Sequence, residues 1–271
     1  MRPVILYRDI GEWEEEEKSA FNHFPLFQRR SDIPSNSLVI GRYSVLPFYK
    51  ELEDELIWND SKLINTYRQH RYVADLSIWY EDLKEYTPKT WFRLEDLPDD
   101  GPFFLKGETN SKKFFWNTHC FAKNKKEAIE IEGRLFEDSL IHNQKICIRQ
   151  FIPLKTFMIG LRGLPITNEY RFFCYKKEIL SGGYYWASHT DEVRSLGVDL
   201  NPAQVPMDFL NTIANIAGDR VNFWVMDVAQ KENGDWILIE LNDGQMSGLS
   251  ENNPWFMYRL LKEFLDTEQE Q

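Results

Sequence analysis

The strongest constraint on the fold is the Asn-Gly pair at 233–234, which lies between two segments of alternating apolar residues. Asn-Gly favours a type I′ turn, because that turn needs positive φ at both central residues. A two-residue loop would pair Glu232 with Asp235 and fix the register of both strands. Counted outward, this register places Asp227 directly opposite Glu240. The segment therefore predicts an antiparallel hairpin in which two acidic residues face each other.

The two faces of this hairpin differ in chemistry. Period-two alternation places Asn242 on the same face as Asp227 and Glu240. Facing carboxylates cost roughly 0.2–1 kcal/mol in a sheet, but a divalent cation reverses that sign, and oxygen ligands suit Mg²⁺. A solvated hairpin face is an equally good interpretation of this stretch alone. The other face is expected to be core, with Trp224, Met226 and Val228 against Ile237, Ile239 and Leu241.

Length and composition indicate a globular chain. The 271 residues suit one large domain or two to three closely packed subdomains, and 42% of them are hydrophobic. The net charge of −11 argues against a general nucleic-acid binder, although a local basic cleft remains possible. Nucleic acid is therefore an unlikely partner.

The three cysteines and five histidines form neither a disulfide framework nor a zinc motif, since no CxxC or HExxH spacing occurs. Buried, reduced cysteines in a cytoplasmic protein are the favoured interpretation. The acidic run at 12–17 rules out a secretory signal at the N-terminus, and no apolar stretch reaches the roughly 18 residues of a membrane span. We expect a soluble protein without membrane contact; an oligomer is possible.

The first third of the chain alternates predicted strands with predicted helices, which indicates a small open α/β unit. Strands are expected at 3–7, 37–41 and 62–65, and helices at 46–56 and 73–86, the second ended by Pro88. The loop-rich segment 88–101 marks a boundary.

The remainder mixes strands and helices and many connections resemble hairpins, which is typical of an α+β fold. A polar loop is expected at 107–113, and the last helix should begin at Pro254 with Asn253 as its N-cap. Strands are expected at 102–106, 145–153, 169–177 and 178–186, and helices at 125–140 and 206–217, the latter capped by Gly218.

Several residues outside the hairpin could carry chemistry. Lys106 ends an apolar strand, where a lysine either reaches water or meets an anion. Lys112 and Lys113 follow in the polar loop and are more simply surface residues, because that loop lacks a phosphate-binding motif. Glu169 and Arg171 share one strand face; the arginine could stabilise phosphate oxygens or hold a carboxylate, although a cross-strand ion pair is commoner.

The strand that ends near Pro153 leaves free backbone groups, which a planar base could use between Phe151 and Ile152. An edge strand that enters a loop is an equally good interpretation. Hydrolase chemistry has little support, because "GQMSG" lacks the GxSxG spacing and no histidine is placed suggestively near Ser247.

Together these features resemble the ATP-grasp superfamily, and "NEYRFFCYKKEILSGGYYW" with "ELNDGQMSGL" is most similar to its RimK-like clade. The resemblance covers roughly residues 60–265 and is most specific at the Glu-x-Asn of the hairpin. It implies an α+β fold in which two α+β subdomains clasp ATP, preceded by a small N-terminal α/β unit with an open parallel sheet. The implied division is 1–90 for that unit, 91–160 for the lid and 161–271 for the C-terminal subdomain with the metal site.

The resemblance also implies a mechanism. ATP would place its adenine against Gln150, Phe151 and Ile152, with Lys106 and Lys113 on its phosphates. Mg²⁺ would be bound by Asp227, Glu240 and Asn242, and the catalytic residues would be Arg171, Lys106 and Glu169. A substrate carboxylate, of a small molecule, amino acid or peptide, would become an acyl phosphate and then an amide with an amine acceptor.

Two departures from the family pattern matter, and two other functions stay open. Many members carry Asp-Lys where this chain has Asp75-Leu76, and a Glu is common where it has Gln150. A kinase acting on a hydroxyl acceptor, or a non-catalytic nucleotide-binding protein, would fit the same residues. Side chains that could line an acceptor site, or be ordinary turn or surface residues, are Gln245, Ser247, Trp186 and Arg194.

Overall fold

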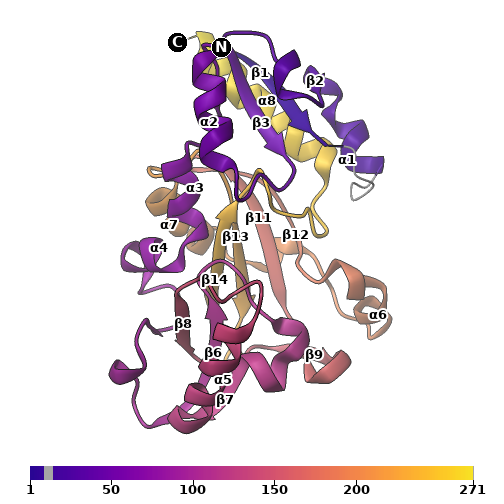
Figure 1. Cartoon of the computed structure of the whole chain (residues 1–271). Helices are drawn as coiled ribbons and strands as arrows, with labels where there is room; N and C mark the ends of the chain where they lie inside the picture. Colours follow the sequence, from indigo (N-terminus) through magenta and orange to yellow (C-terminus); the bar gives the residue numbers. More distant parts are fainter. Residues whose placement is uncertain (9–14, 271) are drawn as a thin grey trace.

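The computed structural model describes residues 1–8 and 15–270. Three four-stranded sheets lie along the molecule, and both termini lie at the same end (Figure 1). The sheets are numbered in chain order; in space the third lies between the first and the second. The first sheet has the order β2-β1-β3-β4 and is parallel throughout, as the α/β interpretation predicts. Its strands are β1 (Arg2–Tyr7), β2 (Leu26–Phe27), β3 (Ser37–Arg42) and β4 (Lys62–Leu63), and helices α1 (Glu15–Ala20) and α2 (Tyr49–Trp58) accompany it.

Both faces of this parallel sheet are covered, which explains why its strands are continuous apolar runs. Val4 and Val39 pack with Leu52 of α2 in one core cluster. Ile5 points to the other face and packs with Met257 of the last helix, α8 (Pro254–Glu270). Helix α8 begins where the sequence predicts. The C-terminal helix of the chain therefore packs against the N-terminal sheet.

The single helix predicted over 73–86 is wrong, because the chain forms two helices, α3 (Tyr67–Ala74) and α4 (Leu76–Leu83). Asp75 between them has extended backbone angles (φ −94°, ψ 105°) and breaks the helix. Helix α3 starts at a capping box in which Thr66 and Gln69 bond reciprocally. That Thr-x-x-Gln pattern was visible in the sequence and marks the missed start.

The second sheet is antiparallel, has the order β5-β8-β6-β7, and packs against helix α5 (Lys125–Glu137) around Phe103, Leu105 and Ile131. A separate hairpin, β9 and β10, follows it and was not predicted. The bounds are β5 (Thr90–Trp91), β6 (Asp100–Gly107), β7 (Phe121–Asn124), β8 (Ile146–Gln150), β9 (Thr156–Ile159) and β10 (Pro165–Thr167).

The third sheet is antiparallel, has the order β12-β11-β13-β14, and carries the largest core on the face that packs against α3, α4 and α7. Its elements are β11 (Glu169–Tyr175), β12 (Glu178–Tyr184), α6 (Thr190–Ser195), α7 (Met207–Ala217), β13 (Phe223–Gln230) and β14 (Trp236–Asp243). Short helical turns occupy Phe21–His23, Arg30–Asp32, Leu94–Asp96, Lys113–Phe115, Trp116–Cys120, Leu161–Gly163, Ala187–His189 and Pro202–Gln204.

The β13–β14 hairpin confirms the predicted pairing of Asp227 with Glu240, but by a different route. The loop has three residues, since Lys231 N donates to Asp235 O at 2.7 Å, and within it only Gly234 has a positive φ, of 94°. This shifts the register by one residue near the turn. A bulge at Asp227/Val228, with Ile239 as the extra residue, restores it.

The expected core face is therefore wrong in part. Val228 pairs with Leu238, and Leu238 and Leu241 enter the core with Trp224 and Met226. The bulge turns the half-buried Ile237 and Ile239 away from it.

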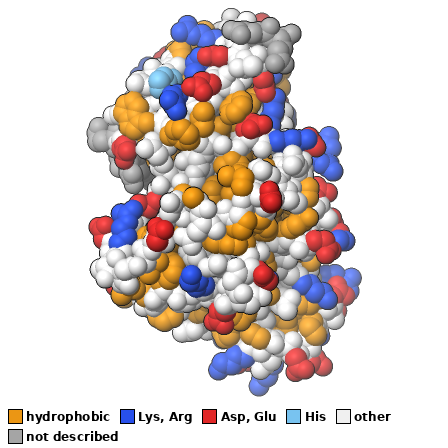
Figure 2. All heavy atoms as spheres, turned by 180° about the vertical axis from the view of Figure 1, so that it is seen from behind, with side chains coloured by type: hydrophobic (Ala, Val, Ile, Leu, Met, Phe, Trp, Pro, Cys, Tyr) orange, Lys and Arg blue, Asp and Glu red, His pale blue; other side chains and the backbone are white. Residues whose placement is uncertain are grey.

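Charges are interspersed on the surface. On the face in Figure 2, basic side chains lie among acidic and apolar ones rather than in one continuous field. None of the described helices is both long and apolar enough to cross a membrane. The division at residues 90 and 160 stays a prediction; the core under the third sheet also contains residues of α3 and α4.

Candidate active site

A pocket opens between the second and third sheets and the β9–β10 hairpin, and most of its wall is apolar. Side chains of Phe104, Trp116 and Leu164 line it together with Gln150, Phe151 and Ile152, the residues expected to contact a base. The expectation of free backbone groups there is wrong for two of the three N–H groups. Gln150 N donates to Lys89 O at 2.7 Å, and Phe151 N donates to Pro102 O at 3.0 Å.

Arg149 also lines this pocket and was not singled out from the sequence. It is buried on β8 and donates to Ile239 O and Thr87 Oγ1, both at 2.6 Å. Burial lowers the pKa of Arg149 to about 10. An arginine inside the apolar run "ICIRQ" was the available signal.

Asp227 and Arg171 form a buried, bidentate ion pair next to the pocket. Arg171 Nε and Nη2 each donate to one oxygen of Asp227 at 2.8 Å, and Asp227 has no exposed surface. Arg171 Nη1 donates to Gly248 O at 2.9 Å. Burial alone would lower the pKa of Arg171, but Asp227 outweighs it and the pKa is raised. The guanidinium therefore stays charged beside the hairpin.

Glu240 faces Asp227 across the hairpin and contacts a second cation. Its carboxylate accepts a hydrogen bond from Lys106 Nζ, and Lys106 is only 4% exposed. Burial would raise the pKa of Glu240, but Lys106 and then Lys113 outweigh it, so the pKa is lowered. Glu240 is thus ionised, and Lys106 at the end of β6 meets an anion rather than water.

The donor set fits a hard divalent ion in its chemistry. Asp227, Glu240 and the half-buried Asn242 share one face of the hairpin, and each can present a side-chain oxygen to an ion. Oxygen ligands are those that Mg²⁺ prefers. Both Asp227 oxygens already accept from Arg171, so Glu240 and Asn242 are the more accessible pair. Within residues 1–8 and 15–270, no group of three or more His, Cys, Asp or Glu could hold a metal. A site here would need the amide.

Glu169 lies at the start of β11 and lines the pocket. It is 2% exposed; Thr167 Oγ1 donates to its Oε2 at 3.0 Å, whereas Oε1 is buried with no hydrogen-bond partner among the described residues. Burial raises the pKa of Glu169, and the nearby Lys113 only partly opposes this. An unpaired buried acceptor that faces a pocket is a candidate contact for a ligand hydroxyl or ammonium group.

Glu169→Gln is expected to stabilise the protein more at pH 7 than at pH 4. Because the folded pKa is raised, the folded state holds the Glu169 proton at pH values where the unfolded chain has lost it, so Glu169 disfavours folding as the pH rises. Urea unfolding at both pH values measures this, with the exposed Glu178→Gln as control. An equal change at both values would contradict the prediction.

The polar loop after β6 separates its two lysines. Lys112 Nζ lies 2.7 Å from Asp138 Oδ2, which fits the interpretation as a surface residue. Lys113 instead lines the pocket, and its Nζ lies 3.3 Å from the hydroxyl of Tyr185. The backbone N–H groups of Thr109 and Asn110 both donate to Gln144 Oε1, which holds the loop in place.

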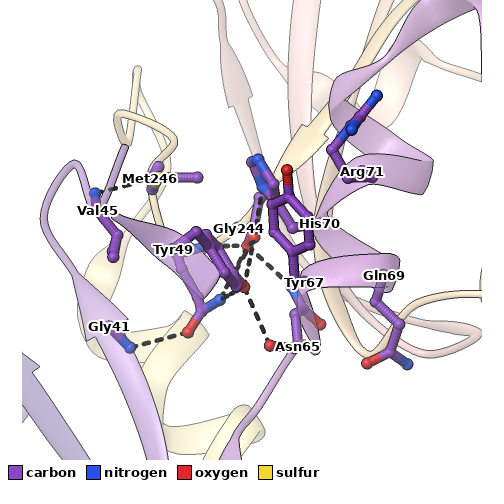
Figure 3. A network of polar contacts seen from close by, with 12 residues as sticks. Gly41, Val45, Tyr49, Asn65, Tyr67, Gln69, His70, Arg71, Gly244 and Met246 are labelled. Atoms are coloured by element: carbon purple, nitrogen blue, oxygen red, sulfur yellow. Dashed lines mark hydrogen bonds and ion pairs between the residues drawn. The ribbon is translucent and has the colours of Figure 1, made fainter. Parts of the chain in front are cut away.

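The loop after β14 is tied to the first unit by a buried polar network (Figure 3). Asp243 accepts hydrogen bonds from Tyr49 Oη at 3.1 Å and Asn65 Nδ2 at 2.8 Å, and His70 Nδ1 lies 3.2 Å from it. Gln245 Oε1 accepts from Gly41 N at 3.0 Å. These contacts come from β3, α2 and α3, so they fix the end of the strand that carries Glu240.

The sequence left open whether four side chains line an acceptor site or are ordinary turn or surface residues, and the structure now places each of them. Gln245 is 1% exposed within the network, and Ser247 Oγ donates to Asp243 O at 2.8 Å, so both hold the loop. Arg194 is exposed and lies 3.7 Å from Glu251. Trp186 lines the pocket. Of the four, only Trp186 is placed beside the candidate site.

Residues 94–261 match the family model described as the ATP-grasp domain, R2K clade family 3. The chain belongs to this ATP-grasp family. No curated protein matches the sequence.

Solved ATP-grasp structures share the fold. D-alanine–D-alanine ligase from Bacillus anthracis, complexed with ATP, is 13% identical, covers 100% of this chain and 99% of its own, and has a TM-score of 0.59. D-cycloserine synthetase DcsG is 11% identical, with 97% and 99% covered and a TM-score of 0.59. A RimK domain ATP-grasp protein from Sphaerobacter thermophilus is 14% identical, with 91% and 92% covered and a TM-score of 0.52.

These similarities confirm the ATP-grasp fold implied by the resemblance, and the structural neighbours include ATP-dependent ligases. Because the chain belongs to the ATP-grasp family, we expect ATP to bind in the pocket between the second and third sheets. The roles of individual residues remain predictions.

Proposed function

We propose that this ATP-grasp protein is an ATP-dependent carboxylate–amine ligase that activates its acid as an acyl phosphate. The observation that carries the proposal is the facing pair Asp227 and Glu240, each in contact with a cation from another strand, beside an apolar pocket. Charges of both signs held apart from water suit the transfer of a charged phosphoryl group.

In this proposal the base of ATP lies against Gln150, Phe151 and Ile152, and Lys106 and Lys113 bind its phosphates. Glu240 and Asn242, with Asp227 behind them, hold Mg²⁺, which neutralises phosphate charge when bound. Glu240 must then exchange or share its contact with Lys106. Arg149 donates to the backbone of Ile239 and so fixes the pocket wall beside Glu240.

The reaction has two steps. A carboxylate oxygen of the substrate attacks the γ-phosphorus of ATP, the bond from that phosphorus to the β,γ-bridging oxygen breaks, and ADP leaves with the electron pair. The amine then attacks the acyl carbon, the acyl C–O bond breaks, and phosphate leaves while the amine loses a proton. Arg171 stabilises the charged oxygens, because Asp227 holds its guanidinium rigidly.

The substrate class is an amino acid, a peptide or another small molecule with a carboxylate, together with an amine acceptor. Neighbours in fold support this range: one is a D-alanine–D-alanine ligase, and another, PsnB, was solved with a precursor peptide.

The test is a product assay with ATP and Mg²⁺ and a panel of amino acids and peptides. We expect phosphate release that requires both an acid and an amine, with an amide detected by mass spectrometry. Glu240→Ala should lose at least about tenfold in rate, because it weakens the binding of an ion that supplies several kcal/mol of transition-state charge stabilisation. Glu178→Ala, an exposed site on the same sheet, is the matched control.

Three outcomes would reject parts of the proposal. A phosphoester formed without phosphate release would identify a kinase. Nucleotide binding without any product would identify a non-catalytic binding protein. A Glu240→Ala variant as active as wild type would remove the metal assignment.

A further inference from the structure

Tyr185 follows β12 directly and lies where the polar loop after β6 (residues 107–113) meets the third sheet. Its ring centroid is 4.7 Å from Lys113 Nζ and 5.1 Å from Arg171 Cζ. Lys113 Nζ is also 3.3 Å from the Tyr185 hydroxyl. One aromatic ring thus contacts two cations from different parts of the chain, Arg171 on β11 and Lys113 in the helical turn Lys113–Phe115 after β6.

The ring is anchored on the third sheet. Tyr185 N donates to Glu169 O at 2.9 Å, which fixes the backbone of Tyr185 against β11. Trp186 packs edge-on against Tyr185, with centroids 5.1 Å apart and an interplanar angle of 85°. Trp186 Nε1 in turn donates to Thr167 Oγ1 at 3.1 Å. Tyr185 therefore offers a fixed surface, whereas Lys113 lies at the end of the polar loop that follows β6.

Two cations near one another repel, and the repulsion is strong in a site shielded from water. The negative face of an aromatic ring attracts each of them, and such contacts strengthen when they are desolvated. Asp227 compensates Arg171 directly, but no carboxylate lies within ion-pair distance of Lys113 among the described residues. Glu169 and Glu240 attract Lys113 from farther away, whereas Tyr185 and Trp186 are in direct contact with its ammonium group; the Trp186 ring centroid lies 5.4 Å from Lys113 Nζ.

We propose that Tyr185 is a positioning residue that holds Lys113 and Arg171 side by side, so that both cations face the terminal phosphates of ATP before it binds. The inference rests on the proposed nucleotide site and adds the residue that organises its charge. Preorganised cations lose less freedom when the phosphates arrive, and the nucleotide binds more tightly as a result.

The experiment compares Tyr185→Phe and Tyr185→Leu with wild type by calorimetric titration of Mg·AMPPNP and of AMP. Tyr185→Leu, which loses the ring, should weaken Mg·AMPPNP binding about tenfold, because Lys113 and Arg171 both lose the contact that preorganises them. It should change AMP binding less than about threefold, because AMP lacks the terminal phosphates. Tyr185→Phe keeps the ring and should stay within about threefold for both ligands.

The matched control is Tyr175→Phe, together with Tyr175→Leu. Tyr175 is the last residue of β11, has a lysine 5.4 Å from its ring and donates a hydrogen bond from its hydroxyl to Glu268 at 2.8 Å. It does not line the candidate site. Its variants should leave Mg·AMPPNP affinity unchanged. Thermal melts identify any variant that fails to fold. If Tyr185→Leu fails to fold, Tyr185→Met, which also lacks the ring, takes its place and is expected to show the same loss for Mg·AMPPNP.

Distinct results overturn the inference. Equal losses for AMP and Mg·AMPPNP in Tyr185→Leu would mean that the pocket itself is damaged, and no loss would mean that the ring is not needed. Losses in Tyr185→Phe as large as in Tyr185→Leu would assign the effect to the hydroxyl. A wild-type protein that binds no nucleotide would reject the proposed function as well, so the two failures are distinguishable.

Discussion

Lys106→Met is expected to lower kcat/KM for ATP by about 10²–10³-fold, the loss typical when one preorganised charge donor is removed from a transition state. Lys106 is buried at the end of β6, and its ammonium group contacts Glu240 on β14. Methionine keeps the length of the side chain and removes the charge. The variant would therefore lose the positive charge that β6 places next to Glu240.

The measurement is steady-state phosphate release over a range of ATP concentrations, with Lys112→Met as the matched control. Lys112 lies in the loop that follows β6 and pairs with Asp138, so its variant should stay within about twofold of wild type. Lys106→Arg should recover part of the activity, because a charge returns with different geometry. An unchanged kcat/KM in Lys106→Met would contradict the proposed phosphate contact.

Arg171→Met is expected to destabilise the protein by about 3–5 kcal/mol, because it leaves Asp227 as an uncompensated buried charge. Asp227 has no exposed surface, and each of its two carboxylate oxygens accepts one hydrogen bond from the Arg171 guanidinium. The loss exceeds that of a surface ion pair, since water cannot solvate the remaining carboxylate.

Urea unfolding measures this loss, and the double variant Arg171→Met/Asp227→Leu separates pairing from packing. The double variant should recover much of the stability, because neither charge remains. Arg194→Met, which breaks an exposed pair at 3.7 Å, should cost less than about 1 kcal/mol. A loss below about 1 kcal/mol in Arg171→Met would show that water reaches Asp227 after all.

The hairpin shows how a local prediction can succeed for an incomplete reason. Alternation and the Asn-Gly pair place Asp227 opposite Glu240, as observed. The turn nevertheless has three loop residues, and a bulge at Ile239 compensates for the shift. Turn type and bulge depend on packing against β11 and the core, which the sequence of two strands does not contain. The error appears on the core face, where Leu238 replaces Ile237 and Ile239.

The sequence by itself determined the elements whose cause is local. The parallel apolar runs and the capped start of α8 follow from periodicity and capping within a few residues. Which charges neutralise one another was decided only by tertiary structure. Lys106 meets Glu240 over 134 residues and Arg171 meets Asp227 over 56.

The same holds for Tyr185 and for the Asp243 network, whose partners lie on elements far away along the chain: Lys113 in a helical turn after β6, and Tyr49 and His70 on α2 and α3. Such pairings depend on how sheets pack in space, and packing joins residues without regard to their distance along the chain. Local sequence thus determined which groups could carry charge here, and the packing of the sheets decided where each one meets its partner.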